Sequence, residues 1–112
     1  MTRSDLEHVA AAREHLAHLR RHLERGDLAD DTIFDAVCMR LSAAIESVAM
    51  VDDALRTRAY GDIWPAIWSV RNRIAHGYFA VDRTIIMATV DNDLGEFEEG
   101  LTSIEADAGR DM

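Results

Sequence analysis

Residues 31–48 read DTIFDAVCMRLSAAIESV, and this stretch decides the fold class. Its large apolar residues recur at intervals of three and four, which places them on one side of an α-helix. They are Phe34, Val37, Cys38, Leu41, Ile45 and Val48. Asp30 or Asp31 can cap the first turn. We expect a helix from here to about Leu55, with Cys38, the only cysteine, buried as a small apolar side chain and not bonded in a disulfide.

The segment before this stretch predicts another amphipathic helix, from Ser4 to about Leu23, with Gly26 as its stop. Its apolar residues follow the same spacing and are Leu6, Val9, Ala12, Leu16, Leu19 and Leu23. At about 1.5 Å per residue, each of these two helices is about 30 Å long, a length typical of helical bundles.

A shorter third helix is predicted over Ile63–His76. Asp62 is in position to cap it, and Pro65 is tolerated in a first helical turn. Gly77 is expected to end it, because glycine commonly follows the last turn of a helix.

A fourth helix is predicted after a short connection, with Asp82 as its cap. Its apolar residues are Ile86, Val90, Leu94, Phe97, Leu101 and Ile104. Gly95 is expected to bend this helix, and the tail at residues 107–112 is expected to fray. Together these segments predict an all-α protein, a four- to five-helix up-and-down bundle.

The length and composition bound the remaining possibilities. With 112 residues, the chain is long enough for one buried core, so we expect a single domain over residues 1–112. It has no apolar run of membrane-spanning length, and its N-terminal residues are polar, which argues against a signal peptide. We therefore expect a cytoplasmic protein with no membrane partner.

The charge is distributed unevenly along the chain. The net charge is −9, which by itself disfavours a polyanionic partner. Between Arg56 and Arg83, however, five arginines face two acids, a net charge of +3, whereas the rest of the chain carries −12. The one basic segment therefore surrounds the third predicted helix.

The second predicted helix has another stripe on a different side, formed by Met39, Ala43, Glu46 and Met50. This stripe is consistent with a wide buried face or with a few exposed methionines. It is also consistent with the contact surface of a homodimer, because methionine is common at adaptable interfaces. We favour the homodimer.

Arg71 lies on the same side of the third helix as both tryptophans. This face carries Trp64, Ile67, Trp68, Arg71, Ile74 and Ala75. A guanidinium cannot lose its charge, so burying it requires a carboxylate, an aromatic face or an anionic ligand. Spacing alone leaves a structural ion pair, stacking on a tryptophan and an anion site open.

The sequence Arg71-Asn-Arg-Ile-Ala-His76-Gly-Tyr78 resembles the Arg-x4-His-x-Tyr signature of HEPN ribonuclease toxins paired with a minimal nucleotidyltransferase antitoxin. The similarity covers most of residues 34–101 and is strongest over residues 63–82. Ala44-Ile45-Glu46 lies where this family often has an Ile-Gly-Glu stretch. Gly95 departs from the pattern, since the family commonly has proline there.

The resemblance implies RNA cleavage without a metal or another cofactor, in a cleft where two protomers bring their motifs together. His76 would transfer the proton and Arg71 would hold the phosphate. Asn72, Arg73 and Glu46 would support the substrate or these two side chains. Tyr78 corresponds to the tyrosine that the cognate antitoxin modifies with AMP.

Two alternatives remain open at this point. The same cleft suits a non-catalytic HEPN module that binds a nucleotide or docks a protein. Four histidines of the first helix, His8, His15, His18 and His22, lie within about 80° of one another and have spacings that can chelate a metal. We favour a solvated flank for these histidines, because the stripe lacks an acidic or thiol partner.

Overall fold

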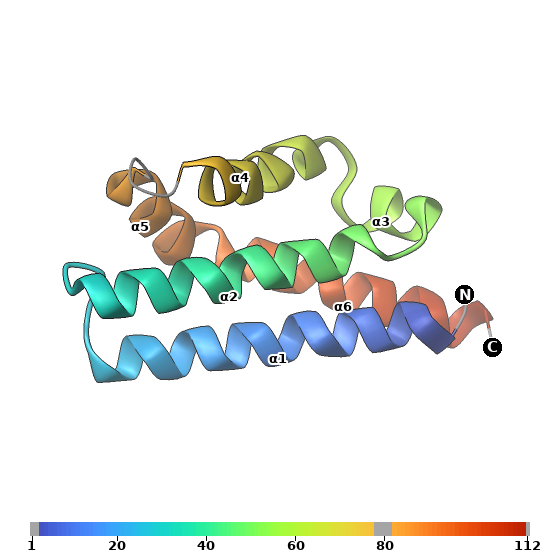
Figure 1. The fold of residues 1–112 in the computed structure, drawn as a ribbon. Helices are drawn as coiled ribbons and strands as arrows, with labels where there is room; N and C mark the ends of the chain where they lie inside the picture. Colours follow the sequence, from blue (N-terminus) through green and yellow to red (C-terminus); the bar gives the residue numbers. More distant parts are fainter. Residues whose placement is uncertain (1–2, 78–81, 112) are drawn as a thin grey trace.

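The computed structural model describes residues 3–77 and 82–111, and every regular element in them is helical (Figure 1). The elements are α1 (Arg3–Arg25), α2 (Asp31–Ala49), α3 (Asp53–Tyr60), the 3-10 turn η1 (Gly61–Ile63), α4 (Trp64–His76), α5 (Arg83–Asn92) and α6 (Leu94–Asp111). The predicted all-α class is confirmed. No helix in the described ranges is long and apolar enough to cross a lipid bilayer.

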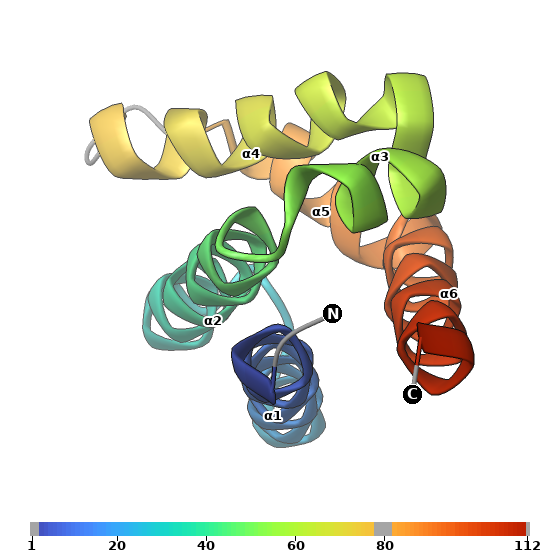
Figure 2. The same ribbon diagram turned by 90° about the vertical axis from the view of Figure 1, so that its right-hand side faces the viewer.

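The long helices form the base of the molecule. Helices α1 and α2 form an antiparallel hairpin, and α6 packs along α1 (Figure 1). Figure 2 views these three helices nearly along their axes and shows α4 crossing obliquely over α2. Helix α3 packs on α6, and α4 packs on α2. The up-and-down arrangement therefore describes α1, α2 and α6, whereas α4 lies across them.

Most of the core lies between α1, α2 and α6, and Ile86 of α5 and Leu55 and Tyr60 of α3 complete it. All six apolar residues predicted for residues 31–48 are buried, and so are most of those predicted for the first and last helices. The largest side chains with almost no exposure are Leu16, Leu19, Leu41, Ile45, Ile86, Leu101 and Ile104. Cys38 is buried and free, as predicted.

Two ion pairs fasten α6 to α1 at the surface of the bundle. The Arg13 guanidinium binds Glu105 at 2.6 Å and also donates to the Thr102 hydroxyl. Arg20 binds Glu98 through both Nη atoms, at 2.9 and 2.5 Å. These contacts place charge outside the apolar layer, where water keeps the cost of desolvation low.

The prediction that the second helix continues to Leu55 is wrong. Helix α2 ends at Ala49, and Asp52 caps a separate helix α3 by accepting a hydrogen bond from the Ala54 N–H at 3.0 Å. Arg56 donates to the carbonyl groups of Ala49 and Val51, which the end of α2 leaves free. Because Val51 and Leu55 are both buried, the apolar pattern continues across the break.

The last predicted helix is also divided. Asp82 caps its start as predicted, accepting from the Thr84 N–H at 2.8 Å, but the chain turns at Asp93 and separates α5 from α6. The predicted fraying of residues 107–112 is wrong for residues 107–111, because α6 continues to Asp111 and Ala108 is buried. Met112 lies outside the described residues.

The third predicted helix corresponds to α4, with a different start. The 3-10 turn η1 precedes it, and no side chain caps α4, so the prediction of Asp62 as the cap is wrong. Gly61 has a φ of 53°, a left-handed conformation that favours glycine and turns the chain out of α3. Pro65 occupies the first turn and Gly77 follows the last, as predicted.

Candidate active site

Helix α4 contains no fully buried residue, although about half of its side chains are apolar. Its large apolar side chains pack partly against the core and stay partly exposed; they are Trp64, Ile67, Trp68, Val70 and Ile74. The face predicted for this helix is therefore the one turned toward the bundle. Its side chains remain reachable from solvent.

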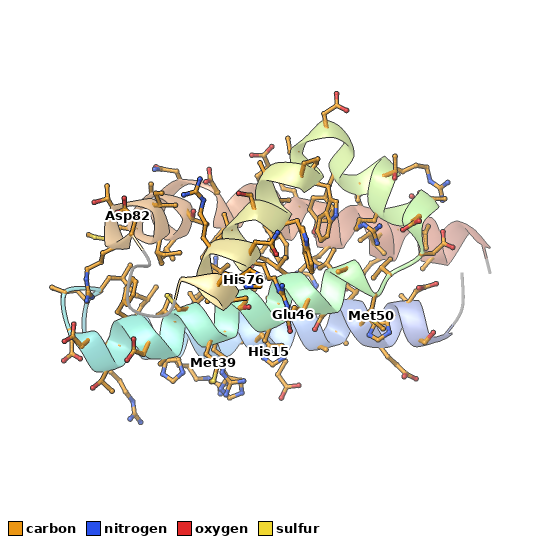
Figure 3. All side chains as sticks on the ribbon, turned by 45° about the horizontal axis from the view of Figure 1, so that its top comes forward. His15, Met39, Glu46, Met50, His76 and Asp82 are labelled. Atoms are coloured by element: carbon orange, nitrogen blue, oxygen red, sulfur yellow. The ribbon has the colours of Figure 1, made fainter. Side chains whose placement is uncertain are left out.

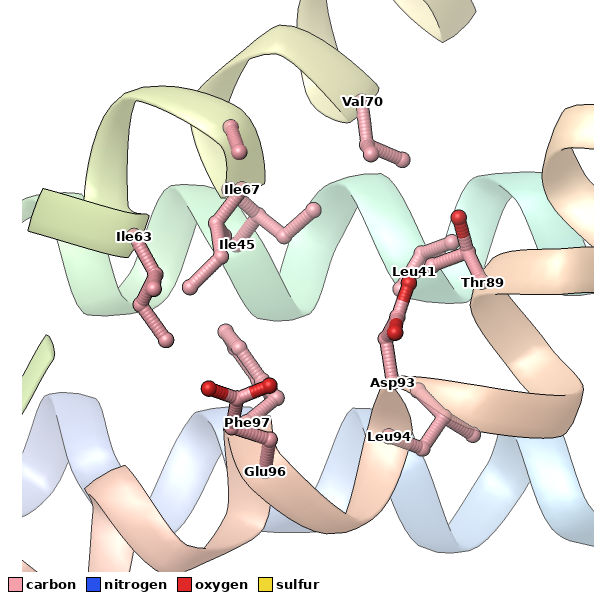
Figure 4. A pocket seen from close by; sticks show the side chains of 11 residues that line it. Leu41, Ile45, Ile63, Ile67, Val70, Thr89, Asp93, Leu94, Glu96 and Phe97 are labelled. Atoms are coloured by element: carbon pink, nitrogen blue, oxygen red, sulfur yellow. The ribbon is translucent and has the colours of Figure 1, made fainter.

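A cavity of about 280 Å³ accounts for part of this loose packing (Figure 4). It lies between α2, α4 and the junction of α5 with α6, where Leu41, Ile67 and Phe97 form apolar walls. Asp93 and Glu96 lie at its polar edge. On this side α4 is therefore only partly supported by the core.

The Arg71 guanidinium is fixed on three sides. Its Nε donates to Glu46 Oε1 of α2 at 2.9 Å, and its Nη1 donates to the Asn72 side-chain oxygen at 3.2 Å. Its central carbon lies 4.9 Å from the centre of the Trp68 ring. The ion pair and the stacking that the sequence left open are thus both present. The Arg71 side chain is 25% exposed, so an anion can still approach it.

Arg71 lies on the wall of an open groove with a volume of about 510 Å³ between α1, α2 and α4. The groove contains His8 and His15 from α1, Glu46 and Met50 from α2, and Trp68 and Arg71 from α4. Side chains from three helices thus place two imidazoles, a guanidinium and an indole on one concave surface.

His76 is exposed in the last turn of α4, above α2 in the view of Figure 3. Five residues on a helix correspond to about 140° of rotation and about 7.5 Å of rise, so Arg71 and His76 leave α4 in different directions. The structure joins Arg71 to Glu46 and Asn72, and within the described residues it shows no hydrogen bond between Arg71 and His76. Arg73 is exposed on α4. Tyr78, predicted as a modification site, lies outside the described residues.

The second stripe of α2 is open to solvent. Met39 is 58% exposed and Met50 is 66% exposed, and Glu46 lies between them on the same side (Figure 3). A wide buried face is therefore excluded for these methionines in the single chain. The predicted homodimer contact at this stripe stays a prediction.

The histidines of α1 are not gathered into a group of possible metal ligands in the part of the chain that the structure describes. In residues 3–77 and 82–111, no three His, Cys, Asp or Glu side chains come together in a group that could hold a metal ion. His15 instead meets Arg40 of α2, whose Nη1 lies 3.1 Å from His15 Nδ1. Partial burial lowers the pKa of His18, and the charges of Arg40 and Arg21 act in the same direction.

The sequence analysis did not select Arg40, although a signal for it was present. In an antiparallel hairpin that turns near residues 26–30, a residue of the first helix lies opposite one at the same distance beyond the turn. This relation places His15 near position 40 of the second helix. The contact between His15 and Arg40 could therefore be deduced once the position of the turn was known. The helical spacing within either segment alone does not predict it.

Comparison with known proteins identifies a family for this chain. A family model described as "Ribonuclease HepT-like" matches residues 8–104, which is most of the chain and includes the groove and α4. No curated protein and no solved structure matches.

Proposed function

Since this chain belongs to the family described as ribonuclease HepT-like, we propose that it is an endoribonuclease whose reaction centres on Arg71 and His76. The observation that carries this proposal is the Arg71 guanidinium, which lies on the wall of an open groove and is oriented by Glu46 and Trp68. A guanidinium held in this way can grip a phosphodiester through the N–H groups that its protein partners leave available.

The reaction requires no metal. The RNA 2′-oxygen attacks the adjacent phosphorus as its proton passes to one imidazole, and the bond from phosphorus to the 5′-oxygen breaks as a second acid protonates that oxygen. The products are a 2′,3′-cyclic phosphate and a 5′-hydroxyl. His76 serves as proton acceptor or donor, Arg71 stabilises the charge that builds on the phosphate, and Asn72 supports Arg71. Arg73, exposed on α4, steers the strand.

A homodimer would supply the second imidazole. A single protomer offers one exposed His76 at the end of α4, whereas two protomers related by a twofold axis would offer two. We propose that the two copies meet along the exposed side of α2 that carries Met39, Glu46 and Met50, with the groove left open between them for RNA. The two copies of α4 would then face one cleft.

We further propose that the protein acts in the cytoplasm as a toxin that a minimal nucleotidyltransferase antitoxin holds in check. Transfer of AMP from ATP to the hydroxyl of Tyr78, with release of pyrophosphate, would add bulk and negative charge two residues beyond His76 in the sequence. An added phosphate group there repels the RNA backbone, so modification would block the substrate without unfolding the protein.

The test is cleavage of a labelled RNA by the purified protein in EDTA. Arg71→Ala and His76→Ala should each lower the cleavage rate by about a hundredfold or more, because each removes a group that acts in the transition state. Arg25→Ala and His22→Ala, which remove the same side chains from α1 outside the groove, serve as matched controls. Both should cleave at the wild-type rate.

Circular dichroism must show that all four variants fold. Intact RNA with folded, unmodified wild-type protein would reject the ribonuclease and leave a module that binds a nucleotide or docks a protein. Mass spectrometry after co-expression with a nucleotidyltransferase antitoxin tests the regulator separately. An increase of one AMP on Tyr78 is expected, and no increase would reject the modification while leaving the nuclease proposal intact.

A further inference from the structure

Arg40 differs from every other half-buried arginine in the described residues. The half-buried arginines are Arg13, Arg40, Arg56, Arg71 and Arg83. Four of them bind a carboxylate, on Glu105, Asp53, Glu46 and Asp31 respectively. Arg40 binds none within the described ranges. A half-buried positive charge without an acid loses hydration and gains no ion pair in return.

The atoms of Arg40 show the same deficit. Its Nε is buried and has no hydrogen-bond partner among the described residues. Its Nη1 lies 3.1 Å from His15 Nδ1. Because a guanidinium can only donate, His15 Nδ1 must accept, which leaves the ring proton on Nε2. Arg40 and His15 therefore present a positive charge and an adjacent N–H donor, a combination that suits a phosphate oxygen.

The position of this pair connects it to the candidate active site. His15 lines the same groove as Arg71 and Trp68. Arg40 and Glu46, the partner of Arg71, are both on α2, about 9 Å apart along the helix axis. Single-stranded RNA can bridge such a distance within a few nucleotides, so one strand can reach both guanidinium groups.

A second arginine–histidine pair, Arg21 and His18, lies beyond the Arg40–His15 pair on the side away from Arg71. Arg21 Nη1 lies 3.5 Å from His18 Nδ1 on α1, and the charge of Arg40 also acts on His18. Glu14 opposes these charges at His18, and Glu46 in the groove is already paired with Arg71. The groove and its extension thus form a local positive track on a chain whose net charge is −9.

We propose that Arg40 and His15 form a second phosphate-binding subsite, which holds the RNA strand beside the cleavage point at Arg71. This inference rests on the proposed function, since it assigns the path of that substrate. A carboxylate of a second protein copy would also satisfy Arg40. Successive Arg–His pairs favour RNA, because a strand presents successive phosphates whereas one acid would satisfy only one pair.

The test measures binding separately from cleavage. A fluorescent single-stranded RNA with 2′-O-methyl sugars lacks the attacking hydroxyl and stays intact. In anisotropy titrations at low salt, Arg40→Ala should weaken binding about tenfold and should lower the slope of log affinity against log salt by about one. Arg20→Ala removes an exposed arginine of α1 that pairs with Glu98 of α6 and lies outside the groove, and it should change the affinity by less than about twofold.

Kinetics with cleavable RNA separate this subsite from the reaction centre. Arg40→Ala should raise KM and leave kcat unchanged, because it removes contact with a phosphate that does not react. If neither the wild-type protein nor any variant cleaves RNA and Arg40→Ala still weakens RNA binding, the proposed function fails and the subsite stands. If RNA is cleaved and Arg40→Ala binds RNA as tightly as Arg20→Ala does, the subsite is overturned.

Light scattering tests the alternative that a carboxylate of a second protein copy binds Arg40. If Arg40→Ala converts a dimer into a monomer, Arg40 binds an acid of a second copy, and the proposal is overturned.

Arg40→Met should melt at or above the wild-type temperature, since it removes an unpaired buried Nε. If the Arg40 variants fail to fold, His15→Ala provides the test, with about threefold weaker binding expected and unchanged binding overturning the subsite.

Discussion

The layer of α1, α2 and α6 and the single helix α4 use apolar residues in opposite ways. In the layer, side chains such as Leu16, Leu41 and Ile104 are at most 2% exposed. In α4, Trp68 and Ile74 are no less apolar, yet neither is fully buried, and a cavity of about 280 Å³ lies beneath the helix. The first region therefore determines the fold, and the second stays attached to it with much of its surface free.

This difference explains where the charged chemistry can lie. A guanidinium buried between α1, α2 and α6 would need a partner for its charge and for every N–H group, because no water reaches it there. Arg71 on α4 needs only one carboxylate, one amide oxygen and an aromatic face, since part of it stays in contact with water. His76 extends from the same helix into solvent. Loose packing of α4 thus leaves space for a ligand, which a fully buried helix could not offer.

The largest expected effect tests the contrast in packing directly. Ile104→Ala in α6 should lower the free energy of unfolding by about 3–4 kcal/mol, because it empties a fully buried site. Ile74→Ala in α4 removes the same atoms from a half-buried site and should cost about 1–2 kcal/mol. Urea unfolding measures both. Equal losses would show that α4 is as tightly packed as the layer and would break the comparison.

The next effect tests how closely α3 and α6 pack. A Cβ built on Gly100 would collide with the Tyr60 ring, and Tyr60 is held there by its hydroxyl, which donates to the Phe97 carbonyl at 2.8 Å. Gly100→Ala should therefore lower the free energy of unfolding by about 1–3 kcal/mol. Gly95→Ala meets nothing within 4 Å and should raise it by up to about 1 kcal/mol. Thermal melts measure both, and stabilisation by Gly100→Ala would show that the Tyr60 ring moves freely.

The sequence predicted the layer well because its helices follow a single rule. A helix that buries one face has apolar residues three and four positions apart, and the six apolar residues predicted to be buried in residues 31–48 are all buried. The break before α3 was missed because Val51 and Leu55 keep the apolar spacing, although Asp52 is a cap residue. The spacing of buried residues therefore does not predict where one helix ends and the next begins.

The site could be predicted only in part, since it depends on contacts between helices. Spacing placed Arg71 on the face with Trp68, and the resemblance selected Glu46, but the ion pair between Arg71 and Glu46 depends on how α4 crosses α2. The Arg40 contact with His15 depends on the register of the α1–α2 hairpin. A helical pattern within one segment contains neither the crossing angle nor the register.

The buried layer also predicts a pH dependence of the free energy of unfolding, which comes from Cys38 in α2. Burial raises the pKa of the Cys38 thiol to about 11 from an ordinary value of 9.0. The unfolded chain therefore loses this proton first, so the stabilising contribution is complete below pH 9 and is lost as the pH rises toward 11, by up to about 2 kcal/mol.

Urea unfolding at pH 8, 9 and 10 measures this loss. Cys38→Ala should flatten the decline between pH 9 and 10. This window lies below the range where Tyr60 acts, because burial also raises the pKa of its hydroxyl from 10.0. An unchanged decline in Cys38→Ala would assign the loss of stability to other groups.

The smallest expected effect on stability belongs to the candidate site itself. Glu46 is 48% exposed, so Glu46→Gln should change the free energy of unfolding by less than about 1 kcal/mol, as would Glu99→Gln on the exposed side of α6. In RNA cleavage the two should differ. Glu46→Gln weakens the contact that orients Arg71 and should lower kcat about three- to tenfold, while KM stays equal or falls because a negative charge leaves the groove. A raised KM with unchanged kcat would mean that Glu46 holds the strand and does not orient the guanidinium. In either case a residue that contributes almost nothing to stability would govern activity, as the loose packing of α4 leads us to expect.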